Sequence, residues 1–333
     1  MKIINIIFFI FFIFFSNSFA ENPLDFNEWK KNFKILALKN NISEKTFDKA
    51  MSNVKFLPNV IKYDRYQPEF YEDTKTYISK RTSLKKIQNG FNFYNQNSDL
   101  INKIENKYKI EKELLLSLMG IETNYGKYVG KMDILSSLST LSYDKRRSQF
   151  FTKELLILLK LIDTNQIDYE TLYGSWAGAF GFFQFMPSTI KNHAIDFNED
   201  NYIDLKNPID AYASAGNYLK NMGWKQESNC FYKITLKENI DSKYLNVSAK
   251  KLINKRKIRY FKKFITDYEK INFLDENLKV AIITPDKDII PNAETLSPAY
   301  IVFDNYEIIL KWNRSLRFAL AVCTLKDKIK DEL

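Results

Sequence analysis

Residues 111–126 read EKELLLSLMGIETNYG, and this stretch decides how the rest of the chain is interpreted. The strongly apolar run from Glu111 to Ile121 predicts a buried helix. The helix ends in a single carboxylate, Glu122, which is followed by polar residues and glycine. A carboxyl group at the edge of an apolar surface loses hydration when charged, so we expect the pKa of Glu122 to rise. Such a glutamate can donate a proton to a leaving oxygen near neutral pH; a structural helix-end glutamate is the alternative.

A second stretch, residues 174–189, reads GSWAGAFGFFQFMPST. Its three glycines permit close backbone approach and positive φ angles. The interleaved aromatic residues offer flat faces on which sugar rings can stack, and Gln184 carries both a donor and an acceptor for hydroxyl or acetamide groups. Pro187 followed by Ser188 or Thr189 predicts the start of another helix.

The remaining pattern is mostly helical. Apolar periodicity predicts helices over 26–54, 83–108 (interrupted at Asn89-Gly90), 148–164, 188–194, 210–222 and 315–325. Pro58 and Pro68 are expected to bracket an extended link. The runs CFYKITL, VAIITP and PAYIVFD-NYEIIL are β-branched and aromatic, and they predict a small sheet near the C-terminus.

Four motifs together resemble the membrane-bound lytic murein transglycosylase B family. In order they are GIETNYG, TLSYDKRR, GSWAGAFGFFQFMPS and NPIDAYASAGNYLKNMGW. Weaker matches, FLPNVIKYDRYQPEF, IQNGFNFYNQ and KWNRSLRFA, extend the resemblance over nearly the whole chain after residue 20. The resemblance implies a lysozyme-like core that cleaves the MurNAc–GlcNAc β-1,4 bond of peptidoglycan without water.

The resemblance also implies a set of site residues. Glu122 matches the catalytic acid/base of the family. The matches to substrate-binding cleft residues are Tyr77, Arg146, Arg147, Ser175, Gln184, Tyr218 and Asn313. Four positions depart from the family pattern, because Trp312 and Phe318 replace common tyrosines and Phe182-Phe183 replaces a common Tyr-Gly. These changes remove hydroxyl groups and affect sugar binding rather than the acid/base.

One carboxylate is sufficient for this chemistry, whereas a hydrolase usually needs a pair. Glu122 protonates the glycosidic oxygen and then, as a carboxylate, accepts the proton of the muramoyl C6 hydroxyl, which attacks C1. The nucleophile is part of the substrate, so proximity replaces a second side chain. A hydrolytic muramidase of similar fold and a catalytically silent peptidoglycan-binding protein are the alternatives.

Residues 196–210 resemble an EF-hand calcium loop. Asp196, Asn198 and Asp200 stand at alternate positions, Tyr202 can contribute its carbonyl, and Asp210 matches an acidic ligand of the family's longer loop. Asn201 replaces the usual glycine and Asn207 replaces the bidentate carboxylate. We expect a structural Ca²⁺ ion here and no organic cofactor; an acidic turn that caps the next helix is the alternative.

The N-terminus predicts export. A lysine, a short apolar run and the small residues Ser18 and Ala20 are typical of a signal peptide that is cleaved after Ala20. We therefore expect a periplasmic protein without a lipid anchor, attached to a membrane only if the leader is retained.

Export permits a disulfide, and Cys230 and Cys323 can pair only with each other, but the sequence does not show that they lie within reach.

The net charge of +10 favours acidic partners, and the cell wall fits this better than nucleic acid, because no basic run is long enough for a nucleic-acid arm. We expect a monomer that binds peptidoglycan glycan strands.

The expected fold class is mainly α (α+β), with a lysozyme-like helical core. The expected regions are a signal peptide (1–20), an N-terminal helical region (21–110), the catalytic core (111–228), a small β-containing region (229–310) and a C-terminal segment that returns to the core (311–333).

Overall fold

The computed structural model describes residues 25–66, 72–287 and 296–333. The predicted signal peptide lies outside these residues. The α-helices are α1 (Phe26–Lys39), α2 (Glu44–Met51), α3 (Pro58–Arg65), α4 (Thr74–Arg81), α5 (Leu84–Tyr108), α6 (Lys112–Thr123), α7 (Ile134–Tyr143), α8 (Ser148–Asp163), α9 (Pro187–His193), α10 (Pro208–Asn221), α11 (Ile258–Phe261), α12 (Asp304–Trp312) and α13 (Leu316–Lys330). The strands are β1 (Met132–Asp133), β2 (Tyr173–Gly174), β3 (Phe231–Ile234), β4 (Arg256–Lys257), β5 (Lys279–Ile283) and β6 (Ala299–Val302). The expected mainly helical fold with a small sheet is confirmed.

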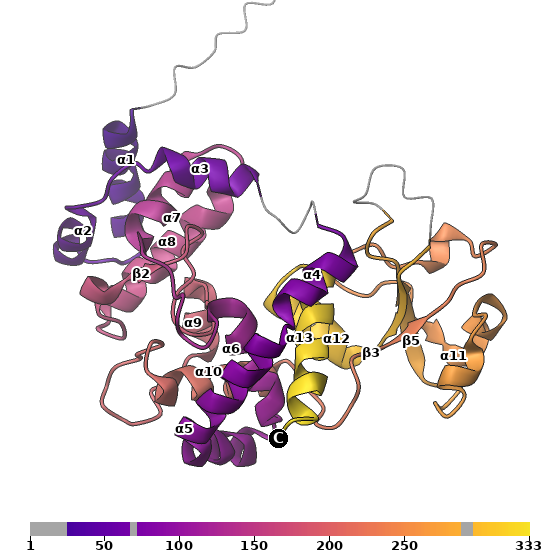
Figure 1. Cartoon of the computed structure of the whole chain (residues 1–333). Helices are drawn as coiled ribbons and strands as arrows, with labels where there is room; N and C mark the ends of the chain where they lie inside the picture. The colour runs from indigo at the N-terminus through magenta and orange to yellow at the C-terminus, as the bar shows by residue number, and fades with distance from the viewer. Residues whose placement is uncertain (1–24, 67–71, 288–295) are drawn as a thin grey trace, which may run out of the picture.

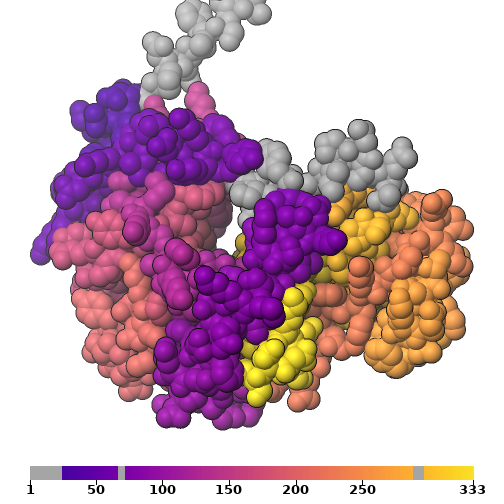
Figure 2. All heavy atoms as spheres, in the orientation of Figure 1, coloured from indigo at the N-terminus to yellow at the C-terminus, as the bar shows by residue number. Residues whose placement is uncertain are grey.

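The helices form one large core around α6. Helix α13 packs against α6, α4, α5 and α12, while α7 and α8 pack on each other and on α3 and α2. Figure 1 shows α1–α3, α7 and α8 on one side of the molecule, α11 and the strands β3 and β5 on the other, and α4, α12 and α13 between them. The surface is hollowed between α3 and α4 (Figure 2).

The four-stranded antiparallel sheet has the order β3-β6-β5-β4 and is covered on both faces. Along β6, Tyr300 and Val302 pack into the helical core, whereas Ala299 and Ile301 pack into a second core formed by residues 234–303. Successive side chains of a strand point to opposite faces. Burial of both faces therefore explains why these strands are apolar throughout instead of alternating.

Three local predictions were wrong. Pro58 starts helix α3 rather than an extended link, because proline fits the first helical position, where no N–H donor is needed. The NYEIIL run belongs to helix α12, in which Tyr306, Ile309 and Leu310 are buried at helical spacing. Helix α5 continues through Asn89-Gly90, and its backbone departs from helical geometry at Asn97 instead.

Two further helix features depart from the sequence pattern. The predicted helix over 26–54 is divided into α1 and α2, with Asn41 in the left-handed conformation (φ 59°). Helix α7 was not predicted, since its sequence ILSSLSTLSY is rich in serine and threonine, which favour caps and turns. Its buried hydroxyls accept hydrogen bonds from the backbone N–H groups of Lys55 (by Ser136) and Leu57 (by Thr140), both at 2.9 Å.

A disulfide joins the sheet to the helical core. Cys230 and Cys323 are bonded, with their Cα atoms 6.2 Å apart. Cys230 precedes β3 and Cys323 lies within α13. The pairing that the sequence left open is therefore present, and it ties the start of the sheet to the helix that packs on α6.

No helix in the described part of the chain has the length and apolar character that a membrane span requires.

Candidate active site

A cleft of about 560 Å³ opens beside the end of α6. Four of the predicted site residues meet in it, namely Glu122, Ser175, Gln184 and Asn313. The other lining residues are Tyr66, Trp176, Ala177, Ala179, Met186, Val247, Ala249, Trp312, Arg314, Ser315, Leu316 and Arg317. Within the described residues, Glu122 is the only carboxylate that lines this cleft.

Glu122 is held at the last turn of a buried helix. Helix α6 is closed by Asn124 and Tyr125, both in the left-handed conformation, and by Gly126 (φ 80°). This is the usual way in which a helix stops abruptly. The Thr123 hydroxyl donates to the Phe182 carbonyl (2.8 Å), which ties the end of α6 to the 174–189 loop. The carboxyl group is thereby fixed, half-buried, where the helix meets the loop.

A lysine supports the same helix end. The Lys86 ammonium donates to the carbonyl of Gly120 at 2.6 Å. Burial lowers the pKa of Lys86, and the neighbouring charge of Arg81 lowers it further. Cations stabilise the carbonyl end of a helix, where the backbone dipoles leave partial negative charge. Lys86 therefore supports the last turn of α6, the turn that carries Glu122.

Trp312 contacts the acid directly. Its indole Nε1 donates a hydrogen bond to Oε1 of Glu122 at 3.1 Å. The ring packs edge-to-face against Phe183, Phe185 and Tyr218, with centroid distances of 6.1, 5.2 and 4.9 Å. Trp312 thus lacks the hydroxyl of the tyrosine that is common at this position, but its indole N–H supplies a different donor, and aromatic packing holds it in place.

Tyr218 lies behind this tryptophan rather than among the lining residues. It is buried, and burial raises the pKa of its phenol to about 12. Its ring also contacts His193, with centroids 4.8 Å apart. In this position Tyr218 supports Trp312, which in turn contacts Glu122.

The 174–189 loop presents its polar groups to the cleft in a tight backbone turn. The Ala179 N–H donates to Ser175 Oγ (3.0 Å), and the Ser175 N–H donates to the Ala179 carbonyl (2.8 Å). Gly178 and Gly181 have φ angles of 87° and 79°, which the turn requires. The Gln184 amide donates to the carbonyls of Gly181 (2.9 Å) and Val129 (3.3 Å), so its side-chain oxygen is the group left to accept from a ligand.

Besides Tyr218, three predicted binding residues are not among the described residues that line the cleft. Tyr77 is buried, with the Arg81 guanidinium 3.4 Å above its ring centre. Arg146 binds the buried carboxylate of Asp64 at 2.7 Å, and Arg147 binds the other oxygen of the same carboxylate. Burial raises the pKa of Asp64, but the hydrogen bonds from the two arginines outweigh it and leave the pKa below its usual range. The arginine pair therefore holds α3, which ends beside the cleft residue Tyr66.

Arg317 lies in the KWNRSLRFA stretch and lines the cleft, although its sequence pattern predicts no role for it. It is 2% exposed and bonds to Asp286 at 2.8 Å. Asp286 also accepts from the N–H and hydroxyl of Thr74. A buried ion pair therefore joins α13, the segment that follows β5, and the start of α4 at the cleft wall. The apolar residues around Arg317 are the one sequence signal of its burial. Its partner, Asp286, is 31 residues away in sequence.

The EF-hand-like loop brings its acidic residues near one another. Asp196 accepts from the N–H groups of Asp200 (3.2 Å) and Asn201 (2.8 Å), and Asn201 takes the positive φ (72°) of the usual glycine. Asp210 is buried and accepts from the N–H groups of Phe197 and Asp204. Burial raises the pKa of Asp210, and the charges of Asp196 and Asp200 raise it further.

The five predicted calcium ligands are Asp196, Asn198, Asp200, Tyr202 and Asp210. The side chain of Asn198 donates to Asp200 at 2.7 Å. In the described part of the chain, no group of three or more His, Cys, Asp or Glu side chains is arranged to hold a metal ion. The loop nevertheless places the carboxylates of Asp196 and Asp200 near buried Asp210, and carboxylate and carbonyl oxygens are the ligands that Ca²⁺ takes.

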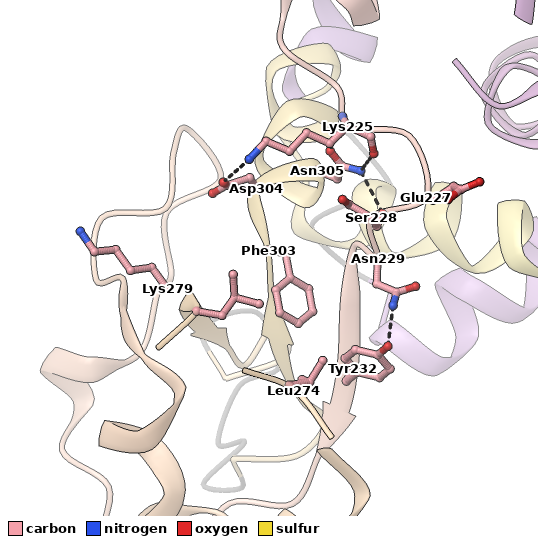
Figure 3. Close-up of a pocket in the computed structure, with 11 residues that line it drawn as sticks. Lys225, Glu227, Ser228, Asn229, Tyr232, Leu274, Lys279, Phe303, Asp304 and Asn305 are labelled. Carbon is pink, nitrogen blue, oxygen red and sulfur yellow. Dashed lines mark hydrogen bonds and ion pairs between the residues drawn. The ribbon is translucent and has the colours of Figure 1, made fainter. Parts of the chain in front are cut away.

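A second hollow, of about 240 Å³, lies where the sheet meets α12 (Figure 3). Phe303 and Leu274 line it, and Asn305 binds the carbonyls of Lys225 (2.7 Å) and Ser228 (2.9 Å). Asp304, one of the two described carboxylates that line it, is paired with Lys225 and, more closely, with Lys255. This hollow is a structural junction, and the cleft at Glu122 remains the candidate active site.

Comparison with known proteins agrees with this assignment. Residues 25–327 match the model of the transglycosylase SLT domain. Over 149 residues, 44% of this chain, the sequence is 40% identical to membrane-bound lytic murein transglycosylase B of Escherichia coli K12, and the match spans about two fifths (41%) of that relative.

Solved structures resemble nearly the whole chain. SltB3 from Pseudomonas aeruginosa, in complex with NAG-anhNAM-pentapeptide, superposes with a TM-score of 0.78 at 28% identity, covering 92% of this chain and 79% of that one. Slt35 of Escherichia coli, a lytic transglycosylase solved in complex with bulgecin A and also with calcium, superposes with a TM-score of 0.75 at 26% identity, covering 95% of both chains.

Proposed function

The chain belongs to the family of the transglycosylase SLT domain, and from that membership we propose that it is a lytic transglycosylase. It cleaves the MurNAc–GlcNAc β-1,4 bond of peptidoglycan strands and leaves a 1,6-anhydromuramoyl end. The observation that carries the proposal is the position of Glu122, a single half-buried carboxylate in a cleft with Ser175, Gln184 and Asn313. A hydrolase usually uses two carboxylates, whereas this chemistry needs one.

Glu122 acts twice. As an acid it gives its proton to the glycosidic oxygen, so that the C1–O bond breaks and positive charge develops at C1. The resulting carboxylate then takes the proton of the muramoyl C6 hydroxyl, whose oxygen forms the new bond to C1. The proton is returned, no water is consumed, and the intramolecular attack benefits from proximity.

The neighbouring groups have distinct parts in this scheme. Trp312 donates to the Glu122 carboxylate and stabilises it after it has given up its proton. The Ser175 hydroxyl stands in the same cleft and can orient the substrate acetamide, while the Gln184 amide oxygen accepts from a sugar hydroxyl or acetamide N–H. The predicted binding roles of Tyr77, Arg146, Arg147 and Tyr218 are retained as indirect ones, through the packing around the cleft.

The test is Glu122→Gln. Purified sacculi are digested with wild type and variant, and the products are analysed by mass spectrometry. We expect anhydro-ended fragments from the wild type, none from the variant, and unchanged muropeptide binding by both. Near-normal cleavage by the variant excludes Glu122 as the acid. Fragments heavier by one water support the hydrolytic muramidase, and binding without any cleavage by the wild type supports a silent binding protein.

We further propose that Ca²⁺ binds the loop formed by Asp196, Asn198, Asp200, the Tyr202 carbonyl and Asp210. The ion offsets the negative charge around buried Asp210. Its role is structural, because the same loop includes Leu205, whose carbonyl accepts a hydrogen bond from the Phe182 N–H of the 174–189 loop at 2.8 Å. Isothermal titration of the chelated protein tests this proposal; no heat and no change in Tm at millimolar Ca²⁺ would exclude it.

We propose that the protein acts as a monomer in the periplasm, exported by residues 1–20. The substrate supports this location, since peptidoglycan lies outside the inner membrane. Cell fractionation together with N-terminal sequencing of the mature protein tests both export and cleavage after Ala20, and gel filtration tests the oligomeric state.

A further inference from the structure

The positive charge of the chain is concentrated in one short segment. Residues 241–270 contain ten Lys or Arg and three Asp or Glu, whereas the whole chain contains 50 and 40. This segment thus accounts for seven of the ten net positive charges. Charge of one sign gathered in one region raises the local concentration of oppositely charged ligands.

The beginning of this segment forms part of the cleft. Val247 and Ala249 line it, and the next two residues, Lys250 and Lys251, are exposed. Consecutive Cα atoms are about 3.8 Å apart, so the Cα atoms of Lys250 and Lys251 lie within about 8 Å of that of the lining residue Ala249. The segment therefore brings charge to the same cleft that holds Glu122.

The turn that carries these lysines is fixed to the sheet. Asn246 is fully buried, and its N–H donates to the Ile282 carbonyl at 2.7 Å. Its side chain donates to the Ser248 carbonyl and accepts from the Ile253 N–H, both at 2.8 Å. A defined backbone thus presents Lys250 and Lys251, in contrast to lysines on a loose tail.

The charges at this edge are not neutralised within the described residues. Neither Lys250, Lys251 nor the cleft residue Arg314 forms an ion pair there, whereas Arg317 is paired with Asp286. Glu122 is the only carboxylate of the described cleft lining. An anionic group on a bound substrate consequently finds uncompensated positive charge here.

We propose that Lys250 and Lys251, together with Arg314, form a subsite for the carboxylates of the peptide attached to the glycan strand. The proposal rests on the function proposed above and specifies its substrate class: peptide-bearing strands bind better than strands whose carboxylates are neutralised. Amide-linked peptides place free carboxylates beside the sugar backbone, which makes them the anions nearest to a cleft that holds the sugars.

The experiment uses the full chain with Lys250→Glu and Lys251→Glu combined. The matched control is Lys31→Glu with Lys39→Glu, two exposed lysines of α1 that change the net charge equally and lie on the opposite side of the molecule from the sheet (Figure 1). The substrates are soluble peptide-bearing glycan fragments, either native or with their carboxyl groups amidated by carbodiimide coupling.

We expect KM for native fragments at low salt to rise about fivefold to tenfold in the Lys250/Lys251 variant, with kcat unchanged. Amidated fragments and the control variant show no such change, and about 0.5 M salt reduces the difference. The proposal is overturned if KM does not rise, if it rises equally for amidated fragments, or if it rises equally in the control variant.

Binding is also measured with Glu122→Gln in each background, because that readout needs no turnover. If no form cleaves peptidoglycan, the proposed function fails while the binding comparison still decides the subsite. A last measurement is co-sedimentation with anionic phospholipid vesicles. If the Lys250/Lys251 variant no longer sediments with the vesicles but still binds the glycan fragments as the wild type does, the lysines bind a membrane surface, and the proposal is overturned.

Discussion

The indole Nε1 of Trp312 lies 3.1 Å from Oε1 of Glu122 and donates a hydrogen bond to it, across 190 residues of sequence. An indole can only donate, so the contact favours the ionised carboxylate over the protonated acid. It therefore assists the stage of the reaction at which Glu122 has given its proton away. The cost is a smaller fraction of protonated acid at a given pH.

Trp312→Phe removes this donor and keeps an aromatic ring. A hydrogen bond to a charged group is worth about 1.5–3 kcal/mol, and we expect kcat to fall about tenfold. The carboxylate is less stabilised, so the alkaline limb of the pH–rate profile should move to higher pH. Steady-state rates measured across pH check both effects.

Two further variants separate the hydrogen bond from the packing. Phe185→Leu removes a ring that contacts Trp312 at 5.2 Å and should lower stability without moving the pH profile. Trp312→Tyr supplies a hydroxyl donor and should recover part of the rate. A pH profile that is unchanged in Trp312→Phe contradicts a role for the indole donor.

The parts of the site that the sequence predicted are local. The apolar run before Glu122 and the glycine-rich stretch with Ser175 and Gln184 each carry their own pattern, and both meet in the cleft. Local pattern is also sufficient for the long helices, because their apolar periodicity repeats over several turns.

The parts that were missed depend on distant partners. Nothing near Arg146 and Arg147 indicates that their partner is Asp64, about 80 residues earlier. The NYEIIL run predicts a strand because a short apolar run fits either a buried strand or a buried helix, and the neighbouring β6 is itself apolar on both faces. Packing, rather than local preference, decides between them.

Removal of Arg146 and Arg147 should destabilise the protein more than removal of their partner Asp64. Asp64 is 2% exposed, whereas the side chains of Arg146 and Arg147 are 45% and 39% exposed. Replacing both arginines by alanine leaves a buried carboxylate without its two charged neighbours and should cost about 3–5 kcal/mol. Asp64→Ala leaves arginines that can reach water, so we expect a smaller loss of about 1–2 kcal/mol. Urea unfolding measures both.

The pH dependence of this cluster follows from the lowered pKa of Asp64. A carboxyl group whose folded pKa lies below its unfolded value of 3.8 contributes stability above that value and loses it as the pH falls through the folded pKa. The stability difference between wild type and Asp64→Ala should therefore shrink below about pH 4. A larger loss for Asp64→Ala than for the arginine double variant contradicts the asymmetry.

The disulfide between Cys230 and Cys323 closes a loop with a sequence separation of 93 residues. A cross-link over a long loop restricts the unfolded chain, and typical disulfides contribute about 2–4 kcal/mol. We expect reduction of the wild type to lower the unfolding free energy by about this amount, measured by urea titration with and without reductant. The variant with both cysteines replaced by alanine should not respond to reductant. Equal stability of the oxidised and reduced wild type would falsify this contribution.

Buried tyrosines predict how the protein unfolds at alkaline pH. Burial raises the pKa of Tyr218 and of Tyr300 to about 12, compared with 10 in the unfolded chain. Between these values the unfolded chain releases phenol protons that the folded protein retains, so stability falls as the pH rises from 10 to 12. The expected loss is at most about 2.7 kcal/mol for each tyrosine, since one pH unit corresponds to about 1.36 kcal/mol.

Phenylalanine variants test this prediction. Tyr218→Phe and Tyr300→Phe should each make the unfolding free energy, measured by urea titration from pH 9 to 12, depend less steeply on pH. Tyr128→Phe is the matched control, because that side chain is 73% exposed and is hydrated in both states. The sign is decisive, since a phenol that ionised more easily in the fold than in the unfolded chain would make the protein more stable with rising pH. An unchanged slope in both variants would mean that neither phenol is kept protonated by burial.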